Sequence, residues 1–139
     1  MTAKKNKSAF PGTLKISCVL AMMIGVTCIP LELARRWHQL TDLQYFFAWF
    51  DDIIMGSFLL WGVWKTYRSG NGQRFLAAAW GFATGLIYSS LFFQFSNRNL
   101  PDPSGVSVNI VLAGKFLAFA ISIAGLFMSI LTNNGSTKN

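Results

Sequence analysis

Two adjacent aspartates, Asp51 and Asp52, interrupt an apolar stretch at residues 45–64 that is long enough to cross a lipid bilayer. A carboxylate near the centre of a membrane helix costs roughly 2.5–3.5 kcal/mol on insertion scales. Such residues are therefore expected to have a partner, or to face water, a ligand or another subunit. Carboxylates in this setting can neutralise a buried cation or carry a proton, so both aspartates are candidate binding residues.

Four apolar segments can be recognised in the chain, and each has about 20 residues, enough to cross a hydrocarbon core of about 30 Å as a helix. They are residues 14–33, 45–64, 75–95 and 109–131. Of the 139 residues, 53% are hydrophobic and only 12% are charged, whereas soluble domains have about a quarter of their residues charged. The sequence thus predicts an all-α fold, a single four-helix transmembrane bundle over residues 13–131. The basic tail 1–12 and the polar tail 132–139 are expected to be disordered.

The polar residues of these segments are expected at similar depths. With alternating spans, the second and fourth segments enter from the same side, and the third leaves toward it. Asp52 lies seven residues into the second segment and Lys115 six into the fourth, or about 10 and 9 Å at the helical rise. Tyr88 lies at a matching depth, seven residues before the end of the third segment, and Gln94 lies nearer the surface. We therefore expect these side chains in the same half of the bundle.

Asp51 and Asp52 point about 100° apart on a helix, so they cannot occupy the same groove. Asp52 has small residues four positions to either side, including Gly56, which permits close approach of a neighbouring helix. We predict that Asp52 faces the bundle interior and pairs with Lys115 or accepts a hydrogen bond from Tyr88. Asp51 is then expected to face another groove or a partner subunit.

Arg35 and Arg36 follow the first segment on the same side and can reach down to the second carboxylate. The group of polar residues either fixes helix register by mutual neutralisation, which we favour, or serves transport or a proton relay. In both cases the candidate binding residues are Asp51, Asp52, Tyr88, Gln94, Lys115, Arg35 and Arg36.

Lysine and arginine are unequally distributed between the two sides of the predicted bundle. The side of the two tails has eight: Lys4, Lys5, Lys7, Lys15, Lys65, Arg68, Arg74 and Lys138. The other side has three: Arg35, Arg36 and Arg98. Because cytoplasmic loops carry the excess of cations, both termini are expected in the cytoplasm. The net charge of +7 then reflects topology and attraction to anionic lipid rather than nucleic-acid binding.

Small residues recur every four positions in two segments, a pattern that lets helix backbones approach closely. They are Ala77, Gly81, Gly85 and Ser89 in the third segment, and Gly114, Ala118 and Ser122 in the fourth. We predict that these two faces bury against each other inside one chain. Dimerisation through one of them is the alternative.

The sequence lacks the residues that several kinds of site require. Cys18 and Cys28, the only cysteines, are about 15 Å apart on one predicted helix and cannot form an intrachain disulfide. His38 is the only histidine, too few for a haem or metal site. No phosphate-binding glycine loop or nucleophile motif is present. The sequence therefore predicts no metal and no cofactor.

Three short runs in the second and third segments form a further pattern: residues 49–52 (WFDD), 79–82 (AWGF) and 85–90 (GLIYSS). Together they resemble small bacterial four-helix inner-membrane proteins that have no assigned activity. The resemblance covers two segments, about a third of the chain. It implies a multi-pass protein of the bacterial inner membrane.

Three classes of function stay open. The first, which we favour, is a non-enzymatic membrane protein, oligomeric or an accessory subunit of a larger complex, whose outward-facing polar pocket binds a small ligand or a partner helix. The second is a small ion- or proton-coupled transporter or channel that titrates Asp51 or Asp52. The third is a membrane enzyme acting on a lipid or quinone headgroup, and it is the weakest because no histidine, nucleophile or metal set accompanies Asp52. Expected partners are the bilayer and other membrane subunits, not nucleic acid.

Overall fold

The computed structural model describes residues 11–37, 41, 46–69, 72–102 and 105–131, with the side chains of residues 35 and 46–49 excluded. Within these ranges the chain forms four α-helices and no strand. The helices are α1 (Gly12–Arg35), α2 (Phe46–Arg68), α3 (Gly72–Ser96) and α4 (Val108–Leu131). The predicted all-α fold is therefore confirmed. The predicted tails fall mainly outside the described residues.

Three helices in the described part of the chain are long and apolar enough to cross a membrane: Gly12–Ala34, Gly72–Ser96 and Val108–Leu131. They correspond to α1, α3 and α4. Helix α2 has 23 residues, and it includes Asp51 and Asp52. The helices thus have the length and composition of a membrane protein, as the sequence predicts.

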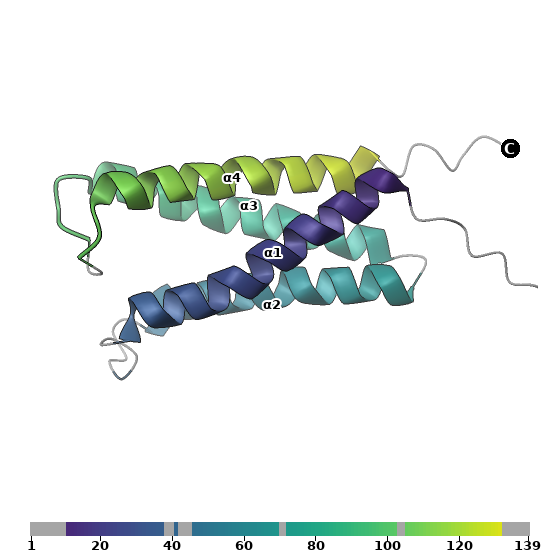
Figure 1. Cartoon of the computed structure of the whole chain (residues 1–139), viewed down its shortest axis with the longest axis horizontal. Helices are drawn as coiled ribbons and strands as arrows, with labels where there is room; N and C mark the ends of the chain where they lie inside the picture. Colours follow the sequence, from purple (N-terminus) through teal and green to yellow (C-terminus); the bar gives the residue numbers. More distant parts are fainter. Residues whose placement is uncertain (1–10, 38–40, 42–45, 70–71, 103–104, 132–139) are drawn as a thin grey trace, which may run out of the picture.

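Each helix packs against the next one along the chain, and α1 also packs against α4. Figure 1 shows α3 and α4 side by side, with α1 crossing in front of the bundle and running alongside α2. The start of α1, the end of α2, the start of α3 and the end of α4 lie at one end of the molecule, which we call the terminal half. The other ends of the helices form what we call the open half.

The apolar core of the described residues is concentrated in the terminal half. It comprises Leu14, Cys18, Ala21 and Ile24 of α1, Met55, Leu59 and Val63 of α2, and Leu76, Ala79, Trp80, Ala83 and Ile87 of α3. Helix α4 contributes Ser122, Gly125 and Ser129 as its buried residues, all in its second half. Spacings of three and four residues place each set on one face of its helix.

Glycines allow the closest helix contacts. A Cβ added to Gly25 of α1 would lie 3.0 Å from the carbonyl oxygen of Gly56 of α2, and one added to Gly56 would lie 3.0 Å from that of Gly25. The two helices therefore cross with glycine against glycine, and Gly56 has the packing role that its small-residue stripe predicts. On the other side of the bundle, the indole of Trp80 lies directly against Gly125 of α4.

Most of the small-residue stripe of α3 does not pack inside the chain, although Ala77 is half-buried beside α4. A Cβ added to Gly81, Gly85 or Gly114 would meet nothing within 4 Å, and Ser89 is exposed. The expectation that these faces of α3 and α4 bury against each other is therefore not met. Helix α3 instead turns to the core the face that carries Leu76, Trp80 and Ile87. Ala118 of α4 is half-buried against that core.

Candidate functional site

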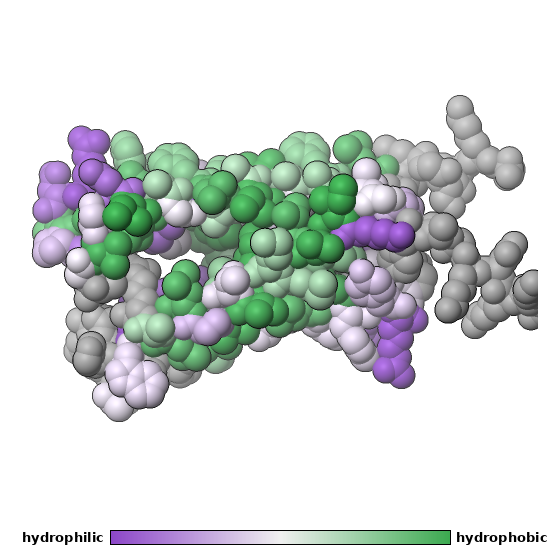
Figure 2. Space-filling view, viewed as in Figure 1, coloured by the Kyte–Doolittle hydropathy of each residue, from purple (hydrophilic) through white to green (hydrophobic). Residues whose placement is uncertain are grey.

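Helix α4 diverges from α1 in the open half but stays beside α3. Its inward-facing stripe is buried in the terminal half, but the same stripe is only half-buried toward the start of the helix. These half-buried residues are Val108, Val111, Leu112, Lys115 and Ala118. Figure 2 shows the molecular surface hollowed between α4 and α1 in this half. Of the polar residues singled out from the sequence, Asp52 lies on the α1–α2 side of this opening and Lys115 on the α3–α4 side.

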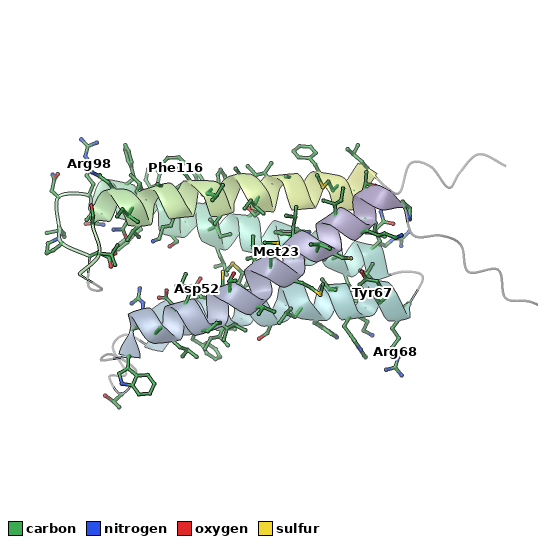
Figure 3. All side chains as sticks on the ribbon, in the orientation of Figure 1. Met23, Asp52, Tyr67, Arg68, Arg98 and Phe116 are labelled. Atoms are coloured by element: carbon green, nitrogen blue, oxygen red, sulfur yellow. The ribbon has the colours of Figure 1, made fainter. Side chains whose placement is uncertain are left out.

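Helices α1 and α2 form one wall of the opening. Asp52 is half-buried and lies on the same face of α2 as the core residues Met55 and Leu59, whereas Asp51 is exposed. The spacing predicts this difference between the two aspartates. Figure 3 shows Asp52 beside the α1–α2 pair, in the half of the molecule opposite to Tyr67 and Arg68.

A second carboxylate and a thiol lie next to Asp52. Glu32 of α1 is buried, with 7% of its surface exposed, and Cys28 lies one helical turn before it. The carboxylates of Asp52 and Glu32 both act electrostatically on the half-buried Cys28 thiol. These three residues lie along α1 and the neighbouring part of α2, and we call them the acidic wall. The sequence analysis did not single out Glu32 or Cys28 for this role.

Arg36 forms an ion pair with Glu32 one turn earlier on the same helix. The guanidinium therefore partly neutralises the acidic wall, although it acts on Glu32 and not on an aspartate of α2. The side chain of Arg35 lies outside the described residues.

Helices α3 and α4 form the opposite wall. The ammonium group of Lys115 donates hydrogen bonds to the hydroxyl of Ser90 at 2.8 Å, the carbonyl of Ser90 at 3.3 Å and the Oε1 of Gln94 at 3.4 Å. The amide of Gln94 in turn donates to the Oδ2 of Asp102 at 3.5 Å, and Asp102 is 5% exposed. Lys115 and Gln94 are thus brought together in the same half of the bundle, as the sequence predicts, although Gln94 was expected nearer the surface. Ser90 and Asp102 complete this group, which we call the lysine wall.

Two predicted contacts have different outcomes. Tyr88 is 55% exposed, and its ring lies against Phe92 and Phe119 at centroid distances of 6.3 and 5.9 Å. It has no hydrogen bond among the described residues, so the predicted hydrogen bond to Asp52 is wrong. The predicted pair of Asp52 with Lys115 stays a prediction. The hydrogen bonds described above hold the lysine to α3, while α2 and α4 lie diagonally across the bundle.

Comparison with protein-family models, curated proteins and solved structures finds no match to this chain. Its function has to be inferred from its own geometry. Within the described ranges, no group of three or more histidine, cysteine, aspartate and glutamate side chains is arranged to hold a metal ion. The arrangement that remains is an opening in a helical bundle with Asp52 and Glu32 on one wall and the ammonium group of Lys115 on the other.

A polar contact of the terminal half was not anticipated from the sequence. The indole nitrogen of Trp80 donates to the hydroxyl of Ser17 at 2.9 Å, and that hydroxyl donates to the carbonyl of Gly125, also at 2.9 Å. Three helices thus meet at one buried serine. The indole N–H of a tryptophan in an apolar segment needs a hydrogen-bond acceptor. The position of the tryptophan in the sequence does not identify which residue on another helix is that acceptor.

Proposed function

We propose that this chain is a four-span protein of the bacterial inner membrane, with both termini in the cytoplasm and the open half facing outward. Three helices have the length and composition of membrane spans, and α2, which packs against α1 and α3, crosses with them. The excess of lysine and arginine at the terminal half supports this orientation.

We further propose that the opening between the two walls is a binding pocket for a small ligand or a partner helix that carries charge. The observation that supports this is the divergence of α4 from α1, with Asp52 and Glu32 on one wall and Lys115 on the other. Charged groups at membrane depth are costly. A ligand of complementary charge would bind more tightly in such a site, because little water is present to screen the attraction between the charges. Contacts of this kind also join the subunits of membrane complexes.

The two native cysteines provide a direct test of the opening. Cys28 belongs to the acidic wall, whereas Cys18 is fully buried in the core on the same helix. In cells with a permeabilised outer membrane, a membrane-impermeant maleimide added from outside is expected to label Cys18→Ala protein, which retains Cys28. It should not label Cys28→Ala protein until the protein is denatured. Equal labelling of the two variants, or labelling of neither, would contradict an outward-facing opening.

The occupant can be captured by in-cell photocrosslinking from α4. A photoreactive amino acid at Val111 faces the opening, and one at Ile110, which is 66% exposed, faces away and serves as the matched control. A crosslinked protein obtained from position 111 alone would indicate a partner helix, and its mass would distinguish a second copy of this chain from another subunit. If no crosslinked protein is obtained, and cell extract protects Cys28 from labelling by the maleimide, a small ligand would be favoured.

Proton- or ion-coupled transport is the second candidate. It is supported by the acidic wall, where the carboxylates of Asp52 and Glu32 both act electrostatically on the Cys28 thiol. Proteoliposomes with a pH gradient and an internal pH-sensitive dye would reveal proton flux that is lost in Asp52→Asn and retained in Asp51→Asn. Flux unchanged by Asp52→Asn would exclude this aspartate as the coupling group.

A further inference from the structure

The two halves of the molecule differ sharply in charge. Every described carboxylate side chain lies in the open half, namely Glu32, Asp51, Asp52 and Asp102. The remaining acidic residue, Asp42, falls between α1 and α2 in the sequence. The terminal half has the described cations Lys15, Lys65, Arg68 and Arg74. This end of the membrane domain therefore has basic side chains without a described acidic partner.

Two of these cations are held by aromatic rings. The ammonium of Lys65 lies 5.9, 5.6 and 5.8 Å from the ring centroids of Trp61, Trp64 and Phe75, and the guanidinium of Arg68 lies 5.2 Å from that of Trp64. Tryptophan and basic residues in this combination are typical of the headgroup region of a membrane. The aromatic rings thus place this end of α2 and the start of α3 at headgroup level.

Arg74 differs from these two residues. It is exposed and has no hydrogen-bond, ion-pair or ring partner in the described part of the chain. It borders a hollow of about 220 Å³ between α3 and α4, lined by Gln73, Arg74, Ala77, Ser129 and Ile130. The amide of Gln73 spans the hollow by donating to the carbonyl of Ser129 at 2.6 Å. The hollow therefore has a cationic rim and an apolar part formed by Ala77 and Ile130.

We propose that this hollow is a binding site for an anionic phospholipid. The phosphate pairs with the guanidinium of Arg74, a geometry that arginine favours, and an acyl chain lies along Ala77 and Ile130. The amphipathic form of the hollow fits a lipid better than a soluble anion, which would leave the apolar part exposed. This inference rests on the proposed insertion of α3 and α4 in the membrane. It does not depend on the opening at the other end.

The test uses the full-length protein in a non-ionic detergent and follows its thermal unfolding as lipid is added. Dioleoyl phosphatidylglycerol should raise the melting temperature more than dioleoyl phosphatidylcholine, which has the same acyl chains and no net charge. Arg74→Gln should raise the half-saturating concentration of phosphatidylglycerol by about fivefold, because a basic residue near an anionic surface contributes about 1 kcal/mol. Arg98→Gln, at the opposite end of the molecule, is the matched control and should leave it unchanged.

Ala77→Leu fills the apolar part of the hollow without changing charge and should also weaken the effect of phosphatidylglycerol. Equal stabilisation by the two lipids would overturn the proposal, as would equal effects of Arg74→Gln and Arg98→Gln. If inorganic phosphate alone raised the melting temperature as much as phosphatidylglycerol does, the site would be assigned to a soluble anion instead. Labelling of Cys28 reports on the other half of the molecule, so a failure here is distinguishable from a failure of the outward-facing pocket.

Discussion

The indole nitrogen of Trp80 on α3 donates a 2.9 Å hydrogen bond to the hydroxyl of Ser17 on α1, at a site where both side chains are fully buried. The same hydroxyl donates to the carbonyl of Gly125, so it ties α4 to the other two helices. This contact lies at the packed end of the bundle. It joins helices that come from the start, the middle and the end of the chain.

Ser17→Ala is expected to destabilise the protein by about 1–2 kcal/mol, because it leaves the buried N–H of Trp80 without an acceptor. The free energy of unfolding can be measured in mixed micelles as the denaturing detergent is increased. Adding Trp80→Phe removes the unsatisfied donor, so the double variant should be more stable than the sum of the two single effects by about 0.6 kcal/mol or more. Ser57→Ala, at an exposed position of α2, is the control and should change stability little. Additive effects would argue against this hydrogen bond.

Gly125→Ala is expected to cost about 1–3 kcal/mol, since the new methyl group would overlap the indole of Trp80 in a packed core. Gly114→Ala on the same helix has open space around its Cβ position. It should be neutral or stabilise the helix by up to about 1 kcal/mol, the difference in helix propensity. The same detergent titration measures both. Comparable losses in the two variants would indicate that the helix face of α4 is not the one described.

Lys115→Gln and Ser90→Ala are expected to be coupled, because the lysine ammonium bonds both the hydroxyl and the carbonyl of Ser90. A double-mutant cycle should give about 0.6–1.7 kcal/mol, the range found for hydrogen bonds between membrane helices. Ser122, two turns away on α4, bonds within its own helix, and Ser122→Ala should add to Lys115→Gln within about 0.5 kcal/mol. The same cycle with Asp52→Asn tests the predicted Asp52–Lys115 pair, for which coupling is also expected.

The proposed orientation predicts the behaviour of reporter fusions. A reporter enzyme that is active only outside the cytoplasm should be active when inserted after Leu100, between α3 and α4, and inactive when inserted after Ser69, between α2 and α3. Replacing Lys65, Arg68 and Arg74 with glutamine removes cations that hold the second connection in the cytoplasm. It should increase activity from the Ser69 position. Activity at Ser69 in the unaltered chain would reverse the assigned orientation.

The sequence by itself determined the helical class and the approximate bounds of each helix. Apolar runs of about 20 residues have few other stable forms in a bilayer, because the backbone must satisfy its own hydrogen bonds there. Counting residues along alternating helices also placed Lys115 and Gln94 in the same half of the bundle, since the rise per residue is fixed. For the same reason Asp52 falls in the same half of the molecule as this lysine.

Only the tertiary structure decided which faces meet. Periodicity shows that Gly81 and Gly85 share a face of α3, but it cannot show whether that face meets another helix or lies on the outside of the bundle. Because α3 turns to the core the face that carries Leu76, Trp80 and Ile87, the glycine face is turned outward. The exposure of Tyr88 and the burial of Glu32 likewise depend on how α3 and α1 are rotated in the bundle. The direction in which a helix is rotated depends on the combined packing of its neighbours, and that combination is a property of the folded chain.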